Sequence, residues 1–120
     1  MNNNNYEIDL GFVITKAPYE SLLGANMLEL AEKSLKDGKS VGVFLISDGV
    51  WFVKKNITGK PGKVFQSITK MGAKVTVSKD NLESAGIDHS ELRKGITISD
   101  KPYVDLVNLV MEKWRRVITI

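Results

Sequence analysis

The sequence predicts a three-layer α/β/α domain built on a mostly parallel five-stranded sheet. Strand-like and helix-like segments alternate along the whole 120-residue chain, a pattern typical of a parallel sheet with helices on its faces. The strand-like segments are nearly continuous apolar runs, as in strands buried on both faces. A chain of this length buries a single core. We therefore expect one domain over residues 7–120, preceded by a disordered tail over residues 1–6.

The first half of the chain predicts two strands separated by a long helix. Residues 8–15 form the first apolar run, and Pro18 then marks the start of a helix over residues 19–36, because proline is tolerated in a first helical turn. Residues 40–46 predict the second strand, which ends in the turn triplet Ser47-Asp48-Gly49. The residues of the helix at helical spacing, expected to face the core, are Leu22, Leu23, Ala25, Asn26, Leu30, Ala31 and Leu35.

The middle of the chain predicts shorter elements. Residues 50–55 predict a short helix, and residues 56–62, with two glycines and a proline, predict a loop. A helix over residues 63–71 and a strand over residues 73–78 follow. Residues 79–85 predict a short helix that ends at Gly86, since glycine readily adopts the left-handed conformation of a helix end.

The carboxyl-terminal third predicts a turn over residues 87–94, a strand over 96–99, a helix and a last strand over 117–120. Asp100 is the expected N-cap of the helix and Pro102 lies in its first turn. Arg115 and Arg116 are expected in its last turn, where positive charge complements the helix dipole. The expected inward stripe comprises Tyr103, Leu106, Val107, Val110, Met111 and Trp114.

The composition excludes several kinds of chemistry for this chain. Its sequence contains no cysteine, so the chain itself can form no disulfide, zinc–thiolate site or persulfide. His89 is the one histidine, which excludes a multi-histidine metal site within a single chain. We expect no metal and no cofactor.

The charge and hydropathy do not indicate nucleic acid or a membrane as partner. The net charge is +3, and the densest basic region, from Lys54 and Lys55 to Lys60 and Lys63, is interpreted as solvated charge rather than a nucleic-acid surface. No apolar run approaches the roughly 18 residues of a membrane span. The expected location is the cytoplasm.

The familiar nucleotide and nucleophile motifs are missing. The segment over residues 59–63, Gly-Lys-Pro-Gly-Lys, lacks the spacing and terminal Lys-Ser/Thr of a P-loop, and the crossover over residues 15–19 has no glycine fingerprint. A serine nucleophile needs a base within reach. An enzyme that uses Ser78 or His89 stays a minor alternative.

The ends of the predicted strands remain as a candidate ligand site. In open parallel sheets ligands bind beyond the carboxyl ends of the strands, where this sequence has small and polar residues. The predicted ligand-binding residues are Thr15, Lys16, Asp48, Gly49 and Ser78. Taken singly, each of them is more simply interpreted as a cap or a turn residue.

Four segments together resemble the DsrE-like family of sulfur-relay proteins, which includes the small subunits of the Tus and Dsr complexes. They are residues 13–18 with the helix that follows; the apolar strand and Asp-Gly-Val turn over 43–50; residues 71–78 with Leu82 and Gly86-Ile87; and the last helix and strand. The resemblance covers nearly the whole chain. It implies a DsrEFH-like fold of the flavodoxin/Rossmann-like type.

The resemblance also implies a lost activity. In active members the third strand ends in a cysteine that accepts sulfur as a persulfide; the matching residue here is Ser78, so no catalytic residue is expected. Three explanations stay open: a cysteine-less subunit of an oligomer, a small-ligand-binding protein that uses the strand-end cleft, or a serine introduced in place of a natural cysteine.

The resemblance further implies oligomers. Members of the family form trimers or hexamers, so we expect a homo-oligomer or a hetero-oligomer with a cysteine-bearing homologue. The apolar segment over residues 50–53 is a candidate contact patch, with a place in the core as the alternative.

Overall fold

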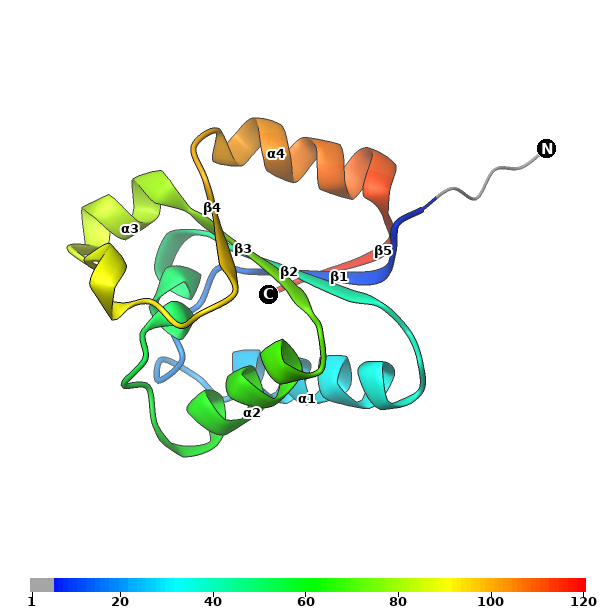
Figure 1. The fold of residues 1–120 in the computed structure, drawn as a ribbon, viewed down its shortest axis with the longest axis horizontal. Helices are drawn as coiled ribbons and strands as arrows, with labels where there is room; N and C mark the ends of the chain where they lie inside the picture. The colour runs from blue at the N-terminus through cyan, green and yellow to red at the C-terminus, as the bar shows by residue number, and fades with distance from the viewer. Residues whose placement is uncertain (1–5) are drawn as a thin grey trace.

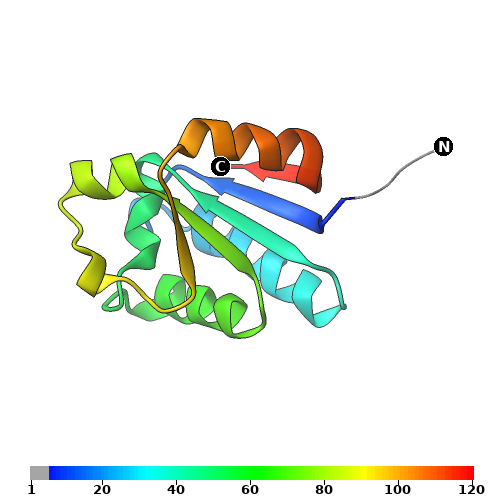
Figure 2. The same ribbon diagram turned by 45° about the horizontal axis from the view of Figure 1, so that its top comes forward.

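The computed structural model describes residues 6–120, so the predicted tail over residues 1–6 lies, apart from Tyr6, outside the described residues. The centre of the structure is a five-stranded sheet in which every strand pair is parallel (Figures 1 and 2). The predicted sheet is therefore confirmed, and its order is β4-β3-β2-β1-β5. The strands are β1 (Ile8–Ile14), β2 (Val41–Leu45), β3 (Lys74–Ser78), β4 (Ile96–Ser99) and β5 (Trp114–Thr119).

Two helices cover one face of the sheet and one helix covers the other (Figure 1). Helices α1 (Leu23–Lys36) and α2 (Gly59–Lys70) lie side by side over the first face. Helix α4 (Pro102–Asn108), which continues into a π-helical turn, η3 (Leu109–Lys113), lies over the second face. Helix α3 (Lys79–Ala85) follows β3 directly and therefore lies beyond the carboxyl ends of the strands. The predicted three-layer fold is confirmed.

The larger core lies between the sheet and the pair α1–α2. Alternate residues of β1 and β2, such as Phe12 and Val43, point into it, and Phe52 and Phe65 lie with ring centroids 5.8 Å apart. A strand contributes to both faces because its side chains alternate, so the intervening residues Val13 and Phe44 belong to the second core under α4.

The second core depends on two glycines that make room for Trp114. A Cβ atom at Gly11 would lie 2.0 Å from Cδ2 of the indole, and one at Gly42 would lie 2.7 Å from its Nε1. The indole therefore lies against the backbone of β1 and β2 and is 3% exposed. Ile8, Val13 and Phe44 complete this cluster, with Leu106, Leu109 and Val110 packed against it.

The first helix begins later than predicted. Helix α1 starts at Leu23, and Pro18 lies in a turn before it instead of in its first turn. The turn is stabilised by the Glu20 carboxylate, which accepts a hydrogen bond from the Ala17 N–H at 3.0 Å. The inward face also differs, because Leu22, Leu23 and Leu30 are exposed. The residues that α1 buries are Gly24, Ala25, Leu28 and Ala31.

The second helix begins earlier than predicted, inside the segment read as a loop. Helix α2 starts at Gly59, with Pro61 in its first turn, a position where proline's fixed φ is compatible with helix. Gly62 is required there because a Cβ would lie 2.1 Å from the Ile57 carbonyl oxygen. The short helix expected over residues 50–55 is a 3-10 segment, η1 (Ser47–Val53).

The segment over residues 50–53 belongs to the core rather than to the surface. Val50, Phe52 and Val53 are fully buried, and Trp51 is half-buried. The suggested contact patch at this segment is therefore wrong. The core reading of the segment is confirmed.

The carboxyl-terminal helix and strand meet at a different place than predicted. Lys101, not Asp100, is the N-cap of α4, although Pro102 does lie in its first turn. Trp114, Arg115 and Arg116 belong to β5 and not to the helix. Of the predicted inward stripe, Leu106 and Val110 pack on the second core, whereas Tyr103, Val107 and Met111 are exposed. Over residues 6–120, no helix has the length and apolar character needed to cross a membrane.

The substitution Gly11→Ala is expected to lower the free energy of unfolding by about 1–3 kcal/mol, because the new methyl group overlaps the Trp114 indole. Urea denaturation followed by circular dichroism measures the change. In a Trp114→Leu background the same substitution should cost less, since the ring is gone. An equal cost in both backgrounds would show that the indole is not what excludes a side chain at Gly11.

Candidate functional site

The carboxyl edge of the sheet brings two buried serines together. Ser78 ends β3, Ser99 ends β4, and the two residues are register partners. Among the described residues they are the two buried polar side chains, at 1% and 3% exposure. Burying a hydroxyl costs free energy unless it has a hydrogen-bond partner. Each serine has such a partner, and the two partners differ in kind.

Ser78 is the N-cap of α3. Its Oγ accepts a hydrogen bond from the Asn81 N–H at 3.3 Å, which satisfies one of the free amide groups at a helix start. The side chain of Asn81 in turn accepts a hydrogen bond from the Ser47 N–H at 3.0 Å. The cap therefore joins the end of β3 to the turn that follows β2.

Ser47 holds an unusual backbone conformation in that turn. Its φ of 50° makes it the one non-glycine residue with positive φ in the part of the chain that the structure describes. Such a conformation costs an L-residue about 1–2 kcal/mol. The hydrogen bond from Ser47 N–H to Asn81 helps to offset this cost.

Ser99 lies in a different electrostatic setting from Ser78. Its hydroxyl donates to a carboxylate oxygen of Asp105 on α4, with 2.6 Å between Oγ and Oδ2. The Nζ of Lys79, the first residue of α3, lies 3.8 Å from Oδ1 of Asp100, which follows β4. The hydroxyl of Ser78 therefore accepts from a backbone N–H, whereas that of Ser99 donates to a carboxylate.

The structure brings some of the predicted ligand-binding residues together. Gly49 packs against the end of β1, because a Cβ there would lie 2.1 Å from the Ile14 carbonyl oxygen. Asp48 is exposed beside Ser47, and the hydrogen bonds through Asn81 connect this turn to Ser78.

The other two predicted residues are engaged elsewhere. The Thr15 hydroxyl donates to the Ile120 carbonyl, and the Nζ of Lys16 lies 4.0 Å from Oε2 of Glu20. Five cavities among the described residues are lined by other side chains. Ligand binding by Thr15, Lys16, Asp48, Gly49 and Ser78 stays a prediction.

The single histidine is exposed in the 3-10 segment η2 (His89–Glu91). Its neighbours form a capping box, in which the Asp88 side chain accepts from the Glu91 N–H and the Glu91 side chain accepts from the Asp88 N–H. The Asp88 carboxylate also accepts from the Ser90 hydroxyl, which lowers the pKa of Asp88, and the hydrogen bond from the Asp88 N–H lowers the pKa of Glu91. Both carboxylates are therefore stabilised in the ionised form. Within residues 6–120 no hydrogen bond joins His89 to Ser78, so the structure supplies no serine–histidine pair.

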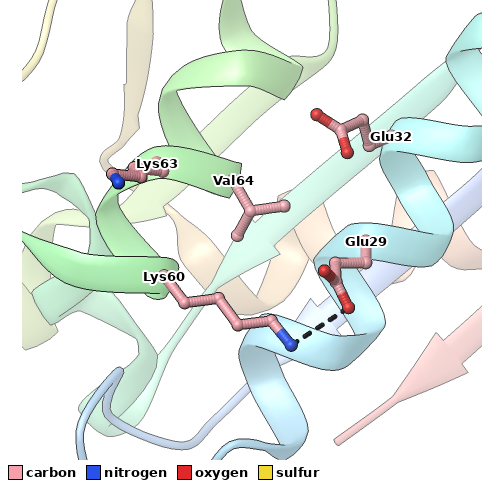
Figure 3. A pocket seen from close by; sticks show the side chains of 5 residues that line it. All are labelled: Glu29, Glu32, Lys60, Lys63 and Val64. Carbon is pink, nitrogen blue, oxygen red and sulfur yellow. Dashed lines mark ion pairs between the residues drawn. The ribbon is translucent and has the colours of Figure 1, made fainter.

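A charged cavity lies between α1 and α2 (Figure 3). It has a volume of about 320 Å³ and is lined by Glu29, Glu32, Lys60, Lys63 and Val64. Lys60 Nζ lies 3.1 Å from Glu29 Oε1, the contact drawn as a dashed line in Figure 3. Glu32 accepts a hydrogen bond from the Ser67 hydroxyl. The lining has two acidic and two basic side chains, so its formal charges sum to zero.

The sequence analysis missed Asn81 and left Ser99 out of the predicted ligand-binding residues. A signal for Asn81 was present, since an N-cap serine bonds to an amide two or three residues further on. The position of Ser99 at the end of a predicted strand was visible in the sequence, but its burial follows from the pairing of β4 with β3 and from the position of Asp105 on α4.

Comparisons with known proteins found a matching family model and a curated relative. The model of the DsrE/DsrF-like family matches residues 9–119. The uncharacterised protein MK0008 of Methanopyrus kandleri is 30% identical over 104 residues, which cover 83% of this chain and 84% of the relative.

Solved structures show the same fold. The ychN protein from E. coli has a TM-score of 0.82 at 22% identity, covering 94% of this chain and 99% of that one. The protein MTH1491 from Methanobacterium thermoautotrophicum has a TM-score of 0.74 at 16% identity, covering 94% and 99%. BT1422 from Bacteroides thetaiotaomicron has a TM-score of 0.70 at 16% identity, covering 93% and 95%.

The substitution Ser78→Ala is expected to lower the free energy of unfolding by about 1 kcal/mol, because it removes the cap of α3. Urea denaturation measures the loss. Ser90→Ala, in the exposed segment η2, serves as a control and should cost less. An unchanged stability for Ser78→Ala would show that the buried hydroxyl does not support the helix.

Proposed function

The chain belongs to the DsrE/DsrF-like family, and from this premise we propose that it is a non-catalytic subunit of a sulfur-relay assembly. The family resemblance implies a sulfur-relay context, with a sulfur-accepting cysteine expected at the end of the third strand. We match that position to Ser78, the last residue of β3. The partners in such an assembly are further copies of this chain or a cysteine-bearing homologue.

The observation that carries the proposal is that Ser78 is a buried residue whose hydroxyl caps a helix. A serine hydroxyl does not ionise near neutral pH, and sulfur transfer needs a thiolate. Ser78 is 1% exposed and its oxygen caps α3. These facts favour a structural role for the side chain. The same backbone N–H that it accepts could also stabilise a thiolate at this position.

The matched variants Ser78→Cys and Ser99→Cys test whether the end of β3 stabilises a thiolate. A thiolate at position 78 would accept the Asn81 N–H, which favours the charged form, whereas one at position 99 would face the carboxylate of Asp105, which disfavours it. We expect Ser78→Cys to take up sulfur from polysulfide about tenfold faster than Ser99→Cys. Intact-mass spectrometry over time measures the uptake, and the unmodified chain should gain none.

Equal uptake by the two variants would contradict the proposal. It would show that position 78 stabilises a thiolate no better than the other buried position does. Unfolding curves for both variants establish that each is folded before the comparison. No uptake by a folded Ser78→Cys protein would also contradict the sulfur-relay assignment.

The outer face of α4 supports the proposed self-association. Tyr103, Val107 and Met111 recur at a spacing of four residues, and with Val104 they are between 58% and 73% exposed. Residues four apart in a helix share one face, and apolar side chains gathered on one exposed face are typical of a protein contact. We propose that this face packs against another subunit.

The substitution Val107→Asp is expected to shift the protein from oligomer to monomer, because it introduces a charge into the centre of this apolar face. Sedimentation velocity over a range of concentrations measures the assembly. Leu30→Asp on α1, where Leu30 is 42% exposed, is the control and should leave the assembly intact. A Val107→Asp protein that sediments like the parent would show that α4 lies outside any contact.

A further inference from the structure

A second open cavity has a basic lining. It has a volume of about 430 Å³ and lies between α2 and two turns that flank η1 and β4. Its lining residues come from three separate segments and are Lys55, Gln66, Thr69, Lys70, Arg93 and Lys94. Four of these described side chains are cationic and none is acidic, in contrast to the balanced cavity between α1 and α2.

Backbone pairing holds two of the cations in place. Lys54 and Leu92 form an antiparallel bridge, and the residues beside them are paired as well. The Lys55 N–H donates to the Glu91 carbonyl at 2.9 Å, and the Arg93 N–H donates to the Val53 carbonyl at 2.9 Å. Lys55 and Arg93 therefore extend from a fixed piece of backbone.

The guanidinium of Arg93 is held in position but incompletely partnered. Its Nη2 donates to the Ile57 carbonyl at 3.2 Å, and its Cζ lies 5.7 Å from the Phe65 ring centroid. Its Nε is buried with no hydrogen-bond partner among the described residues. Burial also lowers the pKa of Arg93. Because arginine stays charged at neutral pH, a bound anion would stabilise this side chain.

Nearby carboxylates do not neutralise the cluster. Glu91 is the nearest in sequence to Arg93, and it pairs with Lys54 at 3.1 Å. The four cations of the cavity form no ion pair with any residue that the structure describes. The cavity thus gathers positive charge that the described chain leaves without a counter-charge.

We propose that this cavity binds the phosphoryl group of a small phosphorylated compound, with Arg93 as its central donor. A guanidinium presents paired donors that match phosphate oxygens, and lysine adds compact positive charge. The volume is that of a small-ligand site. The basic side chains surround one cavity and do not extend along a face, which disfavours nucleic acid. This proposal is independent of the sulfur-relay role.

Nuclear magnetic resonance titration of the ¹⁵N-labelled protein tests the proposal. The probes are inorganic phosphate and glycerol 3-phosphate, added at constant ionic strength with sodium chloride as balance. We expect saturable shifts of the Arg93 Nε–H signal and of the Lys55 and Lys94 amides. Tighter binding of glycerol 3-phosphate identifies an organic phosphate, and binding of inorganic phosphate alone identifies the free anion as the source of the phosphoryl group.

Two double variants with the same change in net charge distinguish binding in this cavity from general electrostatic attraction to a basic protein. Lys70→Gln/Lys94→Gln should weaken phosphate binding about tenfold, because it removes two charge-assisted contacts. Lys36→Gln/Lys101→Gln removes two exposed lysines away from the cavity and should leave binding unchanged. Arg93 itself is kept, since it also anchors Ile57.

Three results would overturn the proposal. Shifts that never saturate, or that sodium chloride reproduces, would indicate general ionic attraction. Equal weakening in the two double variants would show that position in the cavity does not matter. A response to a single-stranded oligonucleotide but to neither small probe would replace the proposal with a nucleic-acid surface.

Discussion

The contact of the Trp114 indole with the bare backbone of Gly11 and Gly42 determines how the second layer of this protein is built. Those two positions leave no space for a Cβ, so the ring can lie against the backbone of β1 and β2. Trp114 is also the first residue of β5. One side chain thus anchors the edge strand and provides the surface on which Leu106, Leu109 and Val110 pack. The opposite face of α4, with Tyr103, Val107 and Met111, is left in solvent.

The carboxyl edge of the sheet shows how neighbouring backbone positions can offer different chemistry. Ser78 and Ser99 have the same side chain, similar burial and paired places in adjacent strands. One oxygen accepts an amide N–H and the other donates to a carboxylate. A negative charge would be favoured at the first position and disfavoured at the second. A thiolate would therefore be better stabilised at the end of β3 than at the end of β4, and the serine present at the end of β3 caps α3.

The two cavities on the α2 side show a similar contrast. Between α1 and α2, Lys60 pairs with Glu29 and Glu32 accepts from Ser67, so the charges are internally balanced. Near Arg93 the carboxylate of Glu91 pairs with Lys54, and the guanidinium of Arg93 keeps a buried Nε without a partner among the described residues. Lys55, which the sequence analysis interpreted as solvated charge, lines the same cavity as Arg93 and Lys94 because the bridge between Lys54 and Leu92 joins their two turns.

The sequence by itself determined the parallel five-stranded sheet, the elements α3 and β4 at their observed bounds, and the position of Ser78 at a strand end. These features follow from local properties, namely continuous apolar runs, a cap and a glycine that ends a helix. Only the tertiary structure decided that Leu30 and Met111 face solvent, that the segment over residues 50–53 is core, and that Trp114 lies in a strand. Each of these depends on which other element covers the residue. That choice is made by contacts between residues far apart in the chain, such as Gly11 with Trp114, which no local pattern records.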